Sequence, residues 1–216
     1  MPVYDKPMIY YPLSTLLNAG IKDILIITTP HDKENFKRLL EDGNKFGINI
    51  SYKVQDSPDG IAQAFLIAED FIKDSPVTLI LGDNLFYGES LNKHFKKASS
   101  NEKGASIFAY PVKNPEKYGV VEFDKKMRVT RIDEKPVIPK SRYAITGIYF
   151  FDNSVVQKAS KVKPSKRGEL EITDLLNKYK KKNKLSADFI GRGGAWLDTG
   201  SISDYYKTSN FVSAIE

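Results

Sequence analysis

The first half of the chain alternates apolar runs, rich in β-branched residues, with segments whose apolar positions recur at helical spacing. These patterns predict three strands, over residues 23–29, 48–54 and 77–81. Helical spacing predicts three helices, over residues 10–19, 32–42 and 61–72. Because strands and helices alternate, we expect an α/β fold with a Rossmann-like, mostly parallel sheet covered by helices on both faces.

The second half has a different pattern, in which short turns separate several strand-like runs. Strands are predicted over residues 105–112, 118–123, 129–133 and 144–151. Helices are predicted over residues 154–161, 169–182 and 203–214. This half therefore adds a smaller antiparallel or mixed sheet beside the parallel one. Since no repeat, low-complexity tract or linker interrupts the chain, we expect residues 1–216 to form a single domain.

The amino-acid composition is informative mainly because it excludes several classes of protein and of metal site. Hydrophobic residues make up 41% and charged residues 28%, which is ordinary for a soluble globular protein. No apolar run approaches the ~18 residues of a membrane span, and the first residues do not resemble a signal peptide. The chain has no cysteine, which excludes disulfides and thiolate metal sites. Together these features predict a cytoplasmic protein without a membrane partner.

The net charge of +6 comes partly from a lysine run near residue 180. A solvated helix end explains this run better than a nucleic-acid site, because only Tyr179 could stack on a base and no binding motif adjoins it. We therefore expect no nucleic-acid partner. A phosphate-rich small substrate would also favour a positive net charge. The run comprises Lys178, Lys180, Lys181, Lys182 and Lys184.

Polar residues beside glycine or proline follow two of the predicted strands, where open α/β sheets bind ligands. Asp83 comes directly after the strand at 77–81, so its carboxylate could hold Mg²⁺ or cap the next turn, and the local sequence favours neither. Gln55 lies between a strand and a helix, together with Pro58 and Gly60. Gln55 could pair with the edge of a pyrimidine, although an ordinary loop explains this segment better when it is taken alone.

Two further segments carry charged residues at strand ends. In one, Lys135 suits a phosphate and Glu134 suits sugar hydroxyls, or the two form a surface ion pair. In the other segment, Asp198 offers a second carboxylate near Trp196. Taken alone, this segment could equally be a core tryptophan followed by a helix cap. The two histidines, His31 and His94, have no partners at ligand spacing and are predicted to be surface residues.

Seven segments, taken in order, resemble the glucose-1-phosphate thymidylyltransferases among the sugar-1-phosphate nucleotidyltransferases. They are residues 5–13, 54–64, 81–84, 118–122, 134–136, 167–174 and 195–200. The resemblance implies the nucleotide-diphospho-sugar transferase fold and a homo-oligomer, commonly a tetramer. It implies transfer of a nucleotidyl group from dTTP to glucose 1-phosphate, which gives dTDP-glucose for dTDP-rhamnose and polysaccharide biosynthesis, with pyrophosphate released. The attack would be direct and in line, assisted by Mg²⁺.

The resemblance also implies a role for individual residues. Mg²⁺ would be held by Asp83 and Asp198. The base would be read by Gln55, in a pocket shaped by Pro58 and Gly60. The nucleotide sugar would be lined by Leu81 and Gly82. Glucose would contact Tyr118, Gly119, Glu134 and Gly147. The sugar phosphate would be bound by Lys135 and Arg167, in a pocket shaped by Glu169 and Trp196.

The resemblance begins after the family's first strand and the glycine-rich loop that, with an arginine and a lysine, holds the triphosphate. A helical extension at the other end is also outside the chain. We expect the absent strand to belong beside residues 24–29, so that neighbouring strands are left with unpaired backbone groups. Two alternatives follow: part of a working transferase, which the intact downstream motifs favour, or a non-catalytic sugar-nucleotide binder or scaffold. The chain by itself is expected to turn over negligibly.

Overall fold

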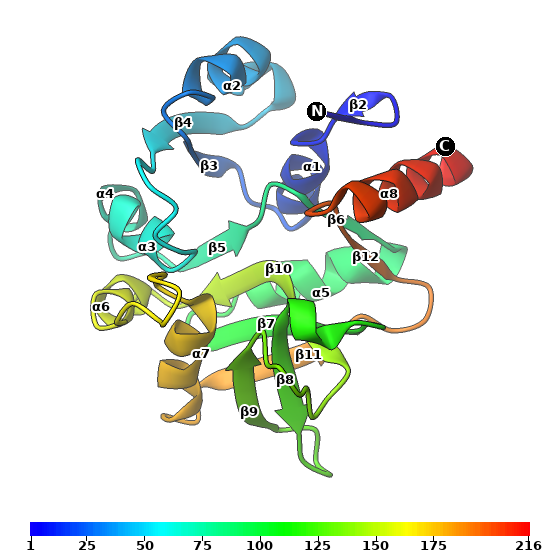
Figure 1. Ribbon diagram of the computed structural model, residues 1–216. Helices are drawn as coiled ribbons and strands as arrows, with labels where there is room; N and C mark the ends of the chain where they lie inside the picture. Colours follow the sequence, from blue (N-terminus) through cyan, green and yellow to red (C-terminus); the bar gives the residue numbers. More distant parts are fainter.

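The computed structural model describes residues 1–216, and its elements follow the predicted order (Figure 1). The helices are α1 (Tyr10–Asn18), α2 (Lys33–Leu40), α3 (Gln63–Ile67), α4 (Glu69–Ile72), α5 (Glu89–Ser99), α6 (Val155–Ala159), α7 (Ile172–Lys180) and α8 (Ile202–Ile215). The strands are β1 (Pro2–Val3), β2 (Lys6–Pro7), β3 (Asp23–Thr28), β4 (Asn49–Val54), β5 (Val77–Ile80), β6 (Asn84–Tyr87), β7 (Ala105–Pro111), β8 (Gly119–Phe123), β9 (Val129–Glu134), β10 (Tyr143–Phe151), β11 (Leu185–Phe189) and β12 (Ala195–Asp198). Short 3₁₀ turns occupy Asn44–Phe46 and Pro115–Lys117.

The largest sheet is mixed and is organised around β10. It has the order β11-β7-β10-β8-β9, and β5 also pairs with β10. The register of β10 against β7 shifts between Ile145 and Tyr149, so β10 meets β8 near its start and β5 near its end. The α/β fold class is confirmed. Parallel pairing, however, is confined to β7–β11 and β3–β4, because β5 pairs antiparallel with β10 and does not pair with β3.

Several element boundaries differ from the sequence predictions. The helix expected over residues 61–72 is divided at Ala68 into α3 and α4. The helix expected to begin at residue 169 begins at Ile172, because residues 165–171 form a loop beside the candidate site. Five elements were not predicted at all, namely the two-residue strands β1 and β2, together with β6, α5 and β11. Of these, α5 buries Leu91, Phe95 and Ala98 on one face, at the spacing of an amphipathic helix.

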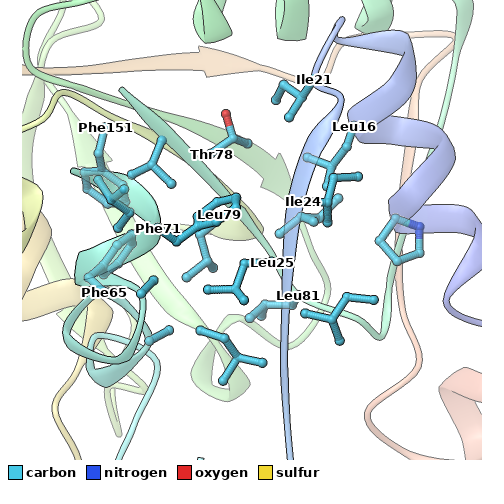
Figure 2. A pocket seen from close by; sticks show the side chains of 18 of the residues that line it. Leu16, Ile21, Ile24, Leu25, Phe65, Phe71, Thr78, Leu79, Leu81 and Phe151 are labelled. Carbon is cyan, nitrogen blue, oxygen red and sulfur yellow. The ribbon is translucent and has the colours of Figure 1, made fainter. Parts of the chain in front are cut away.

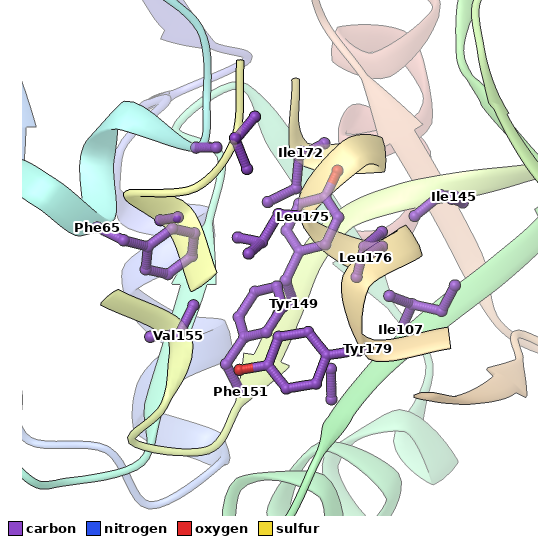
Figure 3. Close-up of a cluster of buried hydrophobic side chains, with 14 of the residues drawn as sticks. Phe65, Ile107, Ile145, Tyr149, Phe151, Val155, Ile172, Leu175, Leu176 and Tyr179 are labelled. Atoms are coloured by element: carbon purple, nitrogen blue, oxygen red, sulfur yellow. The ribbon is translucent and has the colours of Figure 1, made fainter. Parts of the chain in front are cut away.

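The main core lies between the helices α3, α6 and α7 and one face of the sheet around β10. Figure 3 shows Leu175, Leu176 and Tyr179 of α7 directed toward Tyr149 and Phe151 of β10. The Tyr179 ring is fully buried, and its hydroxyl donates to Asp152 Oδ1 at 2.8 Å, so its polar end does not remain unpaired. This packing holds the loop before α7 in a fixed place, and that loop carries part of the candidate site.

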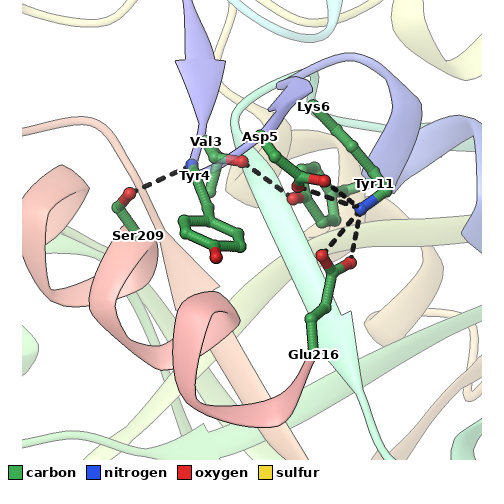
Figure 4. Close-up of polar contacts among 7 residues, drawn as sticks. All are labelled: Val3, Tyr4, Asp5, Lys6, Tyr11, Ser209 and Glu216. Atoms are coloured by element: carbon green, nitrogen blue, oxygen red, sulfur yellow. Dashed lines mark hydrogen bonds and ion pairs between the residues drawn. The ribbon is translucent and has the colours of Figure 1, made fainter.

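The two ends of the chain lie against each other (Figure 4). The backbone N–H of Tyr4 donates to Ser209 Oγ of α8 at 3.0 Å, and the Tyr11 hydroxyl donates to the Val3 carbonyl at 2.9 Å. Lys6 Nζ lies 2.6 Å from a carboxylate oxygen of Glu216. The β1–β2 hairpin is thereby fastened to α8.

A large cavity separates β3 from β5 (Figure 2). Its volume is about 960 Å³, and it is lined by residues 23–27 of β3 and by all of β5. Since β3 pairs only with β4 and β5 pairs only with β10, each strand has one edge without a neighbouring strand. As expected for residues 24–29, one edge of β3 has no strand partner, and the same holds for one edge of β5.

Candidate active site

The predicted site residues gather around two adjoining cavities. The second cavity has a volume of about 370 Å³ and contains most of them, namely Leu81, Asp83, Tyr118, Gly119, Glu134, Lys135, Gly147, Arg167, Glu169, Trp196 and Asp198. The other four, Gln55, Pro58, Gly60 and Gly82, line the larger cavity. Leu81 and Glu169 line both cavities. The loop over residues 55–60, here called the base loop, therefore opens onto the same space as the carboxylates of Asp83 and Asp198.

Asp83 and Asp198 are brought together by the pairing of two short strands. Antiparallel pairing of β12 with β6 places Asp198 opposite Asn84. Thr199 donates from its N–H and its hydroxyl to the carbonyl of Asp83, at 3.1 and 2.9 Å. Burial and the neighbouring charge of Asp83 raise the pKa of Asp198. Burial and the charge of Asp198 raise the pKa of Tyr118 to about 12.

The carboxylates of Asp83 and Asp198 are suitable ligands for Mg²⁺. No group of three or more His, Cys, Asp or Glu side chains that could hold a metal occurs in residues 1–216. Mg²⁺ needs no such group, because it usually binds one or two carboxylates and completes its coordination with waters and substrate phosphates. Two partly buried, mutually repelling carboxylates in an open cavity meet that description.

Asn84 holds three of the predicted residues in place, although sequence reasoning assigned it no role. Its buried Oδ1 accepts from the Gly147 N–H at 3.1 Å and from Trp196 Nε1. Its Nδ2 donates to Asp83 Oδ1 at 2.8 Å. A Cβ at position 147 would overlap the Asn84 amide, which accounts for the glycine there. The feature of the sequence that could have identified Asn84 is its position immediately after Asp83.

Arg167 is surrounded by glutamates. It pairs with Glu169, while Glu171 and Glu134 approach it at 3.4 and 4.0 Å. Glu171 was not predicted, although it belongs to the Arg-Gly-Glu-Leu-Glu run; its side chain is 7% exposed and accepts from Ser165 Oγ at 2.7 Å. Burial and the charge of Glu171 raise the pKa of Glu134. The arginine is therefore held in place by carboxylates before any phosphate binds.

Lys135 lies at the rim of the second cavity. Its side chain is exposed, and its backbone N–H donates to the Tyr118 carbonyl at 3.1 Å. It adopts φ 38°, a conformation that is unfavourable for a residue with a side chain. The turn therefore ties Lys135 to the start of β8, beside Glu134 and Gly119, which are paired across β9 and β8.

The base loop is fastened to the loop before α7. The Leu170 N–H donates to the Asp59 carbonyl at 2.7 Å, and the Ala62 N–H donates to the Leu170 carbonyl at 3.0 Å. Gly60 has φ +102°, and a Cβ there would lie 2.5 Å from the Leu170 carbonyl oxygen. The Leu170 backbone therefore occupies the space beside Gly60. Gln55 Nε2 donates to Gln63 Oε1, which fixes its amide.

The lysine run and the histidines lie outside both cavities. Lys181, Lys182 and Lys184 are exposed after α7, and Lys180 Nζ donates to the Thr130 carbonyl at 2.8 Å. His31 and His94 are exposed, as predicted. No helix of the chain is both long enough and apolar enough to cross a bilayer.

A family model described as nucleotidyl transferase matches residues 1–214 of this chain. The chain belongs to the nucleotidyl transferase family. The glucose-1-phosphate thymidylyltransferase of Neisseria meningitidis serogroup A is 56% identical to it over 216 residues, which are 100% of this chain and 75% of that protein. The enzyme of the same name from Xanthomonas campestris pv. campestris strain B100 is 52% identical over 100% of this chain and 73% of its own length.

The fold of this nucleotidyl transferase also matches that of a solved structure. A Bacillus anthracis protein assigned as a glucose-1-phosphate thymidylyltransferase, crystallised with a sucrose, superposes with a TM-score of 0.91. The two are 36% identical, and the match covers 100% of this chain and 86% of the other. The family resemblance drawn from the sequence is confirmed.

Proposed function

We propose that this nucleotidyl transferase joins dTTP and glucose 1-phosphate to form dTDP-glucose and pyrophosphate. The observation that supports this most is the gathering of a carboxylate pair, two cations, sugar-facing polar groups and a base loop around two adjoining cavities. Relatives more than half identical over the whole chain are named for this reaction. A cytoplasmic setting is consistent with a chain that contains no cysteine.

In our proposal, the site positions the reactants and stabilises charge. Lys135 and Arg167 would bind the sugar phosphate, whose oxygen attacks the α-phosphorus of dTTP directly while pyrophosphate leaves. Asp83 and Asp198 would hold Mg²⁺, which when bound neutralises charge on the phosphates. The reaction needs no enzyme nucleophile, because the sugar phosphate itself attacks.

The glutamates around Arg167 hold its guanidinium in the position where it would bind the sugar phosphate. Glu169 and Glu171 hold the guanidinium in the free protein, and a phosphate would share or replace the exposed Glu169 contact. Burial and the charge of Glu171 raise the pKa of Glu134, whose carboxyl group lines the second cavity, where it can accept from a glucose hydroxyl. At the other end, the fixed Gln55 amide keeps its oxygen free to accept from the N–H of thymine.

The first test is binding of dTDP-glucose with Mg²⁺, measured by calorimetry. We expect saturable binding to one site per chain, weakened at least tenfold by Glu134→Gln and by Asp198→Asn. The control Glu102→Gln changes an exposed residue outside both cavities and should bind like the parent. Absence of binding by the parent at millimolar ligand would contradict the proposal. Binding with UDP-glucose strongly preferred would reassign the base.

A further inference from the structure

The Asn84 side chain lies at the start of β6, where its amide contacts groups from three different elements. Asn84 is 2% exposed, although it lines the second cavity. Its Oδ1 accepts from the Gly147 N–H of β10 and from Trp196 Nε1 of β12. Because both of these groups can only donate, the atom that faces them must be the amide oxygen. The amide NH₂ group therefore faces Asp83, and it donates to Asp83 Oδ1 at 2.8 Å.

The surroundings of Asn84 leave its amide no second orientation. A Cβ at position 147 would overlap Asn84 Oδ1, so the Gly147 backbone lies directly against the amide. The Trp196 ring is held in turn by an edge-to-face contact with Tyr118, at 5.2 Å between ring centroids. A reversed amide would direct its NH₂ group at two other donors and its oxygen at a carboxylate. Asn84 thus sets the positions of Asp83 Oδ1, Gly147 and Trp196 relative to one another.

This chain of hydrogen bonds begins at the charge of Asp83. An amide that donates to an anion becomes a better acceptor at its own oxygen, because consecutive hydrogen bonds polarise one another. The ionised Asp83 therefore strengthens the hydrogen bonds that Gly147 and Trp196 donate to Asn84. Both Asn84 and Trp196 are buried, so water screens this effect only weakly. A cation that draws charge from Asp83 should weaken both bonds.

We propose that Asn84 is a positioning residue that couples the metal carboxylate of Asp83 to the sugar side of the second cavity. The inference rests on the proposed function, because it takes Asp83 as a ligand of Mg²⁺ and Trp196 as part of the sugar pocket. Through one amide, occupation of the metal site changes the hydrogen bonds of Gly147 and Trp196. By linkage, the cation and the sugar then influence each other's binding through the protein itself. An asparagine that only satisfied buried donors would not respond to the charge on Asp83.

The test uses the indole N–H of Trp196, which is the only tryptophan in the chain and gives a single resonance in a nitrogen-15 NMR spectrum. Mg²⁺ alone, added until calorimetry shows saturation, should move the indole proton upfield and speed its exchange with water about threefold or more, because its hydrogen bond weakens. Asp83→Asn should abolish this response. Heat of Mg²⁺ binding without any change at the indole would overturn the coupling. Absence of heat would contradict the metal assignment itself, and the coupling with it.

Variants of Asn84 test whether the amide carries the coupling. Asn84→Ala removes both halves of the link, and water can take the place of the amide because Asn84 lines the second cavity. Its indole N–H should exchange about tenfold faster than in the parent and should not respond to Mg²⁺. Asn84→Asp retains an acceptor for Trp196 and should restore slow exchange. The control Asn92→Ala, at an exposed position of α5 outside both cavities, should behave like the parent.

The decisive comparison is the Mg²⁺ response of the alanine variant. A shift of the indole resonance as large in Asn84→Ala as in the parent would overturn the proposal, because the signal would then bypass the amide. Circular dichroism checks the fold of each variant. If Asn84→Ala does not fold, the side-chain NH₂ resonances of Asn84 in the parent decide. They must move together with the indole resonance when Mg²⁺ is added, and resonances that stay in place would overturn the proposal.

Discussion

The carboxylates of Asp83 and Asp198, which we propose as ligands of Mg²⁺, should also lower the stability of the metal-free protein. Because burial and Asp83 raise the pKa of Asp198, the folded metal-free chain holds that proton more tightly than the unfolded chain does. The stabilising contribution is complete below the unfolded pKa, near pH 4, and is lost as the pH rises through the higher folded pKa. At neutral pH the ionised pair therefore opposes folding until a cation binds.

Asp198→Asn should accordingly melt at a higher temperature than the parent at pH 7 without Mg²⁺, and the difference should shrink toward pH 4. In a longer version that also carries the family's glycine-rich loop, the same variant and Asp83→Asn should each lose nearly all of the turnover of that longer parent. Scanning calorimetry between pH 4 and pH 8, together with a pyrophosphate-release assay, measures both effects. Retention of turnover within a few-fold of the parent at saturating Mg²⁺ would argue against the metal assignment.

Lys135 and the base loop lie at different ends of the candidate site, so one substitution should separate the two substrates. Lys135→Ala should weaken binding of glucose 1-phosphate about tenfold or more, because a phosphate loses a charged partner. Binding of dTTP should change much less. Calorimetry with each ligand measures the split, and Lys140→Ala, an exposed lysine outside both cavities, is the matched control. Equal losses for the two ligands would contradict the assignment.

Among the elements, the contact between the base loop and the loop before α7 links the two cavities. Gly60→Ala should destabilise the chain by roughly 1–3 kcal/mol more than Gly20→Ala does. Both glycines have positive φ, but a Cβ at Gly60 meets the Leu170 backbone, whereas one at Gly20 meets nothing within 4 Å. Urea unfolding of the two variants gives the difference. Equal free energies of unfolding would mean that the loops move apart without cost.

The sequence predicted the strands and helices that have clear periodicity. The candidate site residues that it named line the two cavities, and their individual roles remain predictions. The sequence could not predict β6, because that strand is only four residues long, begins with the polar Asn84 and follows Asp83 directly. Asn84 and Glu171 were missed for a different reason. Their importance comes from hydrogen bonds and ion pairs to residues far along the chain, such as Trp196, or to a loop whose path depends on the packing of α7.

For the whole molecule, the distribution of cations limits what the chain can do unaided. Lys117, Lys135 and Arg167 line the second cavity, but the larger cavity has only Lys22, at the opposite end of β3 from the base loop. A triphosphate seated beside Gln55 would therefore meet few positive charges. We predict turnover far below the roughly 1–10³ per second of typical enzymes. A steady-state assay with dTTP, glucose 1-phosphate and Mg²⁺ measures the rate, and a value within that range would show that the triphosphate needs no further cations.

Assembly is a separate whole-molecule question. The resemblance to the family predicts a homo-oligomer, commonly a tetramer, and that prediction stands on the resemblance alone. Light scattering coupled to size-exclusion chromatography measures the molar mass directly. A mass near 24.4 kDa at micromolar concentration would mean that this chain remains monomeric.

The contact of Lys6 with Glu216 brings the two ends of the chain close enough for the chain to be circularly permuted. Because the β1–β2 hairpin rests on α8, a linker of about eight glycine and serine residues should join the two ends without disturbing either. New ends could then be opened between Lys125 and Lys126, in the exposed turn between β8 and β9. Such a circular permutant should fold to the same far-ultraviolet spectrum, with a melting temperature within a few degrees of the parent, and it would place both ends on the opposite side of the molecule from α8.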